Sequence, residues 1–148
     1  MNILYKYIAT LGFMGHIPFA PGTFGTLAAF AVYILLKPSD FLQIIILILI
    51  IPIGIISSEH TERLLNEKDS RHIVIDEFCG YFSSTLFIPF SMGHAVAAFF
   101  LFRVFDILKP FPIRKIETAF SGGKGIMADD IMAAIYTNLI LQIWVYIN

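Results

Sequence analysis

The sequence is short of charge and of cysteine. Only 14% of its 148 residues are charged, where a soluble domain carries about 25%, and 57% are hydrophobic, which excludes a disordered chain. The formal net charge of -1 gives no basic surface for a polyanion, so we expect no nucleic-acid binding. The single cysteine, Cys79, excludes an internal disulfide and a thiolate zinc site. The length predicts one domain, residues 1–148.

Charge is confined to two blocks of the sequence. Nine of the 21 charged residues lie between Glu59 and Glu77, and nine more between Arg103 and Asp130. Residues 41–56 are apolar around the whole circumference of a helix and approach the roughly 20 residues that cross a bilayer. We therefore predict a membrane-embedded helix there. The alternative is a core helix of a soluble all-α domain.

Residues 78–102 are uncharged but are interrupted halfway by Pro89 and Gly93. Each half is too short to cross a bilayer, so a helical hairpin is at least as good an interpretation as a crossing. A hairpin would place both charged blocks, with most of the positive residues, on the cytoplasmic side. The glycines and prolines of residues 12–25 predict a loop, with a helix resuming at Thr26. The predicted fold is all-α: a compact bundle of apolar helices, membrane-associated or integral, with active-site loops at one face.

Carboxylates at the edges of apolar helices are costly to bury and are candidates for function. Asp76 and Glu77 open one apolar helix, although they would also complement its dipole. Asp106 lies between Arg103 and Lys109 at helical spacing, which suits either an ion-pair ladder or a carboxylate for a cation beside bases for a phosphate.

A third cluster combines a glycine-rich segment, residues 121–125, with Asp129 and Asp130 at the start of the last helix. It is either an anion-binding loop beside metal ligands or a flexible turn with an N-cap. Together the clusters supply hard oxygen ligands without a histidine or cysteine pattern, which favours Mg²⁺ and phosphoryl chemistry. The acids are Asp76, Glu77, Asp106, Asp129 and Asp130, and the nearby bases are Arg103, Lys109, Arg114 and Lys124.

Four motifs resemble, in order and spacing, the bacterial phosphatidylglycerophosphatase A family. They are PGTFGTLAA at 21–29, VIDEFCG at 74–80, FRVFDILKPFPI at 102–113 and GGKGIMADD at 122–130. The resemblance implies an all-α enzyme at the bacterial inner membrane with its active site facing the cytoplasm. It implies Mg²⁺-dependent removal of the terminal phosphate of phosphatidylglycerophosphate, a step of phospholipid biosynthesis that yields phosphatidylglycerol.

A lipid phosphatase needs an anion site where apolar helices meet the headgroups, and the clusters lie at helix ends. We hypothesise that Asp76, Asp106, Asp129 and Asp130 hold Mg²⁺ and activate water, with Glu77 as ligand or general base. Substrate binding is assigned to Thr23, Arg103, Lys109, Arg114 and Lys124. A covalent aspartyl-phosphate route stays open. Two other classes of protein also stay open, a membrane transporter or channel component and a non-catalytic lipid-binding subunit. The oligomeric state is not predicted.

Overall fold

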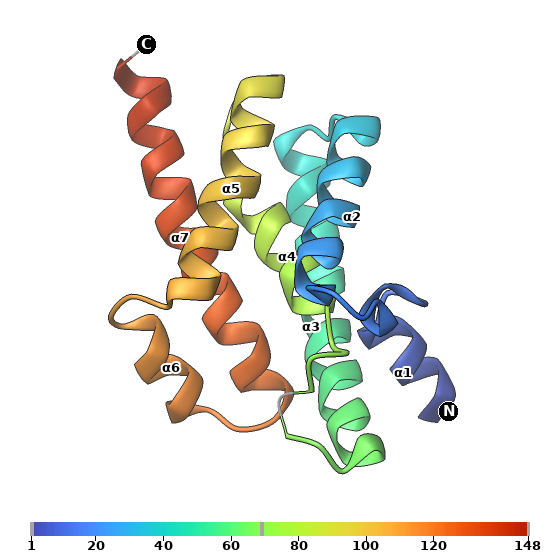
Figure 1. Cartoon of the computed structure of the whole chain (residues 1–148). Coiled ribbons are helices and arrows are strands. Elements are labelled where there is room, and N and C mark those ends of the chain that lie inside the picture. Colours follow the sequence, from blue (N-terminus) through green and yellow to red (C-terminus); the bar gives the residue numbers. More distant parts are fainter. Residues whose placement is uncertain (1, 69, 148) are drawn as a thin grey trace.

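All the regular secondary structure is helical over the part that the computed structural model describes, residues 2–68 and 70–147 without the side chains of Asn2, Glu117 and Thr118 (Figure 1). This confirms the predicted all-α bundle. The elements are α1 (Asn2–Ala9), the short 3-10 helix η1 (Met14–His16), α2 (Pro21–Leu36), α3 (Asp40–Leu65), α4 (Ile75–Ser84), α5 (Met92–Leu108), α6 (Ile113–Ala119) and α7 (Gly123–Ile147).

Two helices, α3 and α7, are long and apolar enough to cross a membrane, with 26 and 25 residues. Only 28% of the most apolar window of each is buried inside the protein. The bundle instead exposes large apolar side chains such as Phe41 (74%), Ile48 (65%) and Phe100 (63%). A core helix of a soluble domain would bury them, so the exposed surface favours a lipid environment.

Helices α4 and α5 form the hairpin expected for residues 78–102. The chain leaves helical structure after Ser84 and turns back before Met92. Glu77 in the first turn of α4 and Arg103 near the end of α5 consequently lie 3.8 Å apart, measured between Oε1 and Nη1. The hairpin therefore brings parts of the two charged blocks to one end of the bundle.

Amide side chains from the long helices satisfy the backbone where α4 ends. Gln43 of α3 donates to the Phe82 carbonyl (2.6 Å), and Asn138 of α7 donates to the carbonyls of Ser84 (3.0 Å) and Leu86 (2.8 Å). Carbonyls at the end of a helix and in the turn beyond it lack partners in the helical ladder, and an unsatisfied one in an apolar slab costs several kcal/mol. Thr85 Oγ1 also donates to the Phe82 carbonyl at 3.1 Å. The turn between α4 and α5 can therefore lie among apolar side chains.

Two helix starts differ from the prediction. Helix α2 begins at Pro21, not at Thr26, because proline suits the first helical position. The last helix begins at Gly123, so most of the predicted glycine-rich loop is its first turn. The glycine there serves close packing, since a Cβ on Gly123 would lie 2.0 Å from the Ile55 carbonyl oxygen. We therefore find no extended anion-binding loop before Asp129 in the described chain.

Candidate active site

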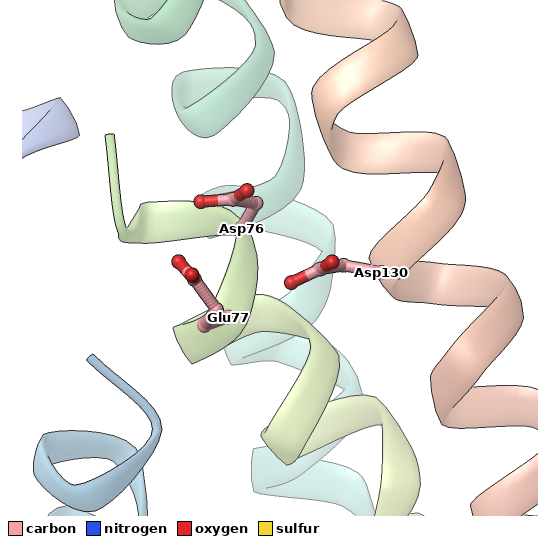
Figure 2. A group of neighbouring side chains, drawn as sticks. All are labelled: Asp76, Glu77 and Asp130. Carbon is pink, nitrogen blue, oxygen red and sulfur yellow. The ribbon is translucent and has the colours of Figure 1, made fainter. Parts of the chain in front are cut away.

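Three acidic side chains from two helices meet at one place in the bundle. Asp76 and Glu77 occupy the first turn of α4, and Asp130 reaches them from the second turn of α7 (Figure 2). One carboxylate oxygen of each lies within 4.8 Å of those of the other two. Close packing of α4 on α7 sets this geometry, since a Cβ on Gly80 would lie only 3.3 Å from the Asp130 carbonyl oxygen. Residues 54 apart in the sequence thus form one acidic cluster, Asp76, Glu77 and Asp130.

The acidic cluster is buried and crowded with carboxyl groups, and Arg103 Nη1 lies 3.8 Å from Glu77 Oε1. Asp76 Oδ1, Glu77 Oε2 and Asp130 Oδ2 are buried without a hydrogen-bond partner among the described residues. Burial, reinforced by the neighbouring Glu77 and Asp130 carboxylates, raises the pKa of Asp76 well above its usual range. Burial likewise raises the pKa of Glu77 to about 7. Three carboxyl groups so close together, each with an unpartnered buried oxygen, fit a divalent cation that binds hard oxygen ligands.

Two ion pairs flank the acidic cluster. Arg103 pairs with Asp106 one turn along α5, and it also approaches Glu77. Half of the predicted ion-pair ladder is therefore present. Lys109 is not part of the ladder, because it follows the last residue of α5 with a positive φ of 43° and donates instead to Asp129 Oδ2 of α7 at 2.6 Å. Each base thus holds an acid next to the cluster.

The first turn of α2 closes one side of the site. The sequence predicts that the glycines beside Thr23 supply hydrogen bonds there, and the structure adds that Gly22 leaves room for the side chains of Glu77 and Arg103. A Cβ on Gly22 would lie 2.0 Å from Glu77 Oε1 and 3.2 Å from Arg103 Nη1. Thr23 is the next residue and is half-buried. The motif at residues 21–29 contains this glycine, directly after the proline that starts the helix.

Two of the predicted substrate-binding residues lie outside this cluster. Lys124 is exposed and borders an apolar groove of about 380 Å³ between α3, α6 and α7. Arg114, on α6, lines a separate pocket beyond the end of α5. The structure thus brings together Asp76, Glu77, Arg103, Asp106, Lys109, Asp129 and Asp130, with Thr23 at the edge.

Comparisons with known proteins identify the family of the chain. The family model described as phosphatidylglycerophosphatase A matches residues 7–145. Proteins named phosphatidylglycerophosphatase A from Haemophilus influenzae and Escherichia coli are 38% and 36% identical, covering 93% and 91% of this chain and 89% and 80% of theirs. A Bacteroides thetaiotaomicron protein, proposed to be a phosphatidylinositol-3-phosphatase, is 37% identical over 88% of both chains. No solved structure matches the chain. The chain therefore belongs to the phosphatidylglycerophosphatase A family.

Proposed function

We propose that this protein is a Mg²⁺-dependent lipid phosphatase of phospholipid biosynthesis. It hydrolyses the phosphomonoester of phosphatidylglycerophosphate to give phosphatidylglycerol and phosphate. The observation that carries this proposal is the acidic cluster, with its unpartnered buried oxygens, beside two bases in a chain of this family. A divalent cation would offset the crowded acids, and the two bases would bind the oxygens of a phosphomonoester.

The cation is held by Asp76 and Asp130, with Glu77 completing the cluster. When bound, Mg²⁺ offsets the negative charge of the phosphate and lowers the pKa of water at the site. Asp106 and Asp129 are further metal ligands in this proposal. Each is now paired with a base, and each is freed as the substrate phosphate takes over that base.

The bases bind and orient the phosphate. Arg103 lies beside Glu77 and Lys109 lies beside Asp129, and they offer guanidinium and ammonium donors to the phosphate oxygens. Thr23 adds a hydroxyl from the first turn of α2. Lys124 and Arg114 contact the substrate outside the acidic cluster. The phosphate is thereby held between donors from the end of α5 and from the first turn of α2.

The protein lies in the bacterial cytoplasmic membrane with this site facing the cytoplasm. The exposed apolar side chains of α3 and α5 support the membrane location, and the basic residues near the site support the orientation. The lipid keeps its acyl chains in the bilayer while its phosphate reaches the helix ends. The position of the acids at helix ends argues against a transport pathway, which would place acids near the middle of the membrane.

Phosphate release from phosphatidylglycerophosphate in detergent micelles tests the activity. We expect release with Mg²⁺, none with EDTA, and at least about a hundredfold less for Asp106→Asn and Asp130→Asn. Asp40→Asn is the matched control, because Asp40 is an exposed carboxylate in the first turn of α3, at the other end of the bundle. Release that persists in EDTA, or full activity of both site variants, would disprove the mechanism.

The same assay separates the alternatives. Because of the name of the Bacteroides relative, phosphatidylinositol 3-phosphate is the second lipid to assay. Faster Mg²⁺-dependent release from that lipid would keep the phosphatase and change the substrate. No release from any phospholipid phosphomonoester would favour a non-catalytic lipid-binding subunit or a transporter component.

Sided labelling of single cysteines in intact cells tests the orientation. Native Cys79 is buried and should stay unlabelled. We expect Lys68→Cys to be protected from an impermeant maleimide and Lys37→Cys, in the turn between α2 and α3 at the other end of the bundle, to react. The reverse pattern would place the site outside the cytoplasm.

A further inference from the structure

A second site, lined by cations, lies next to the candidate active site at the turn between α5 and α6. It is a pocket of about 470 Å³ lined by Leu108, Lys109, Phe111, Arg114 and Lys115, which we call the basic pocket. Among the described residues, its lining has three cations and no acid. Its apolar members are exposed, Leu108 by 65% and Phe111 by 73%.

Two contacts order the wall of the basic pocket. The Tyr136 hydroxyl on α7 donates to the Phe111 carbonyl at 3.0 Å, which ties the turn between α5 and α6 to the bundle. The Lys115 ammonium lies over the Phe111 ring, 5.0 Å from its centre. Arg114 and Lys115 are themselves exposed.

Lys109 is common to both sites. It lines the basic pocket, and its ammonium is 2.6 Å from Asp129, the neighbour of cluster residue Asp130. A ligand that fills the basic pocket and contacts Lys109 therefore extends directly to the acidic cluster. Such a ligand needs one anionic group for each site.

The substrate class proposed above has this form. A phosphatidylglycerophosphate carries a terminal phosphomonoester and, across a glycerol bridge, the phosphodiester that joins it to diacylglycerol. The dianionic monoester suits the acidic cluster with its cation. The diester keeps a single negative charge and is not cleaved, so it needs cations and a nearby apolar surface but no metal ligands.

We propose that the basic pocket binds the phosphodiester of the lipid substrate through Arg114 and Lys115, while Lys109 bridges to the phosphomonoester. This inference rests on the proposed phosphatase activity and deepens it. It makes the enzyme selective for lipids that bear a phosphomonoester beyond a charged diester. Phosphatidic acid, whose only phosphate is the monoester, leaves the basic pocket empty.

The test compares two substrates in variants of the basic pocket. One is phosphatidylglycerophosphate, and the other is an analogue whose diester is replaced by an uncharged methylphosphonate. We expect Arg114→Gln and Lys115→Gln each to raise KM for the natural diester about tenfold with little change in kcat, since ground and transition states share this contact. KM for the neutral analogue should be high in the unmodified enzyme and unchanged by either variant. Arg114→Lys should restore part of the affinity.

Lys68→Gln is the matched control, because it removes one exposed positive charge outside the basic pocket. Equal KM values of the unmodified enzyme for the two substrates would overturn the inference. So would an equal loss on both substrates in the pocket variants, which would indicate a separate anionic lipid acting as an activator. An unmodified enzyme that releases no phosphate from either substrate would instead refute the proposed function itself.

Discussion

Replacing Gly22 by alanine should disable the site while leaving the fold intact. The added Cβ would lie 2.0 Å from Glu77 Oε1, whereas real Cβ contacts essentially never fall below 3.0 Å. The carboxylate must therefore move by about 1 Å, a displacement that costs about a hundredfold in rate, or about 2.7 kcal/mol of transition-state stabilisation. Arg103 Nη1, at 3.2 Å from the same Cβ, leaves little room on the other side.

The fold should tolerate the change because the obstructing atom is the free end of a flexible side chain. Alanine also favours a helix over glycine by up to about 1 kcal/mol. We therefore expect a melting temperature equal to or above that of the unmodified protein. The control is Gly93→Ala in the first turn of α5, where the nearest atom to an added Cβ is Ser91 Oγ at 3.8 Å. That variant should keep full activity.

The assay is kcat/KM for phosphate release across a Mg²⁺ titration, with thermal melts by circular dichroism. A shorter acid supplies an internal check. Glu77→Asp alone should lower activity, and adding Gly22→Ala to it should cost far less than a hundredfold, because the clashing atoms are withdrawn. Gly22→Ala with unaltered kcat/KM and metal dependence would refute the reasoning.

Further predictions concern charge and packing at the same site. Asp130→Asn should raise or preserve the melting temperature without metal, because it removes one of three crowded carboxyl groups that are costly to ionise together. Mg²⁺ at about 100 times its Kd should stabilise the unmodified protein by about 2.7 kcal/mol, and a melt of Asp130→Asn should show no such gain. Lys109→Met should lower stability by about 1–3 kcal/mol in denaturant titrations, since it removes the ammonium that donates to the buried Asp129 carboxylate at 2.6 Å. Gly80→Ala should destabilise by about 1–3 kcal/mol, because its Cβ would lie 2.4 Å from the Phe102 ring, and an unchanged melt would contradict the packing.

The sequence predicts the helical class and the hairpin because both depend on local features. Proline and glycine at 89 and 93 interrupt an apolar run whose halves are too short to cross a bilayer, and the structure has its break at 85–91. It also identifies the acids, because carboxylates are rare in so apolar a chain. These are properties of composition and spacing, which need no tertiary information.

Partners within the site could not be predicted, because they depend on how helices pack. Spacing along α5 places Lys109 with Arg103 and Asp106, yet the helix ends one residue too early, and Lys109 reaches Asp129 on another helix. The sequence predicts loops at Gly22 and Gly123 for the same reason, because it does not show how the helices pack. Only the packed structure shows that Gly22 and Gly123 lie where a methyl group would collide with Glu77 and with the backbone of α3.

A membrane-spanning helix usually gains from more apolar residues, but the amide that caps the end of α4 from α7 is an exception. Asn138 sits in a long apolar helix, and a leucine there would improve every measure of that helix as a membrane span. It would also withdraw two donors from the carbonyls of Ser84 and Leu86. A more apolar residue at this position of α7 would therefore destabilise the hairpin that carries Asp76 and Glu77. One polar residue here satisfies the backbone of the turn, and the surrounding surface can then be apolar.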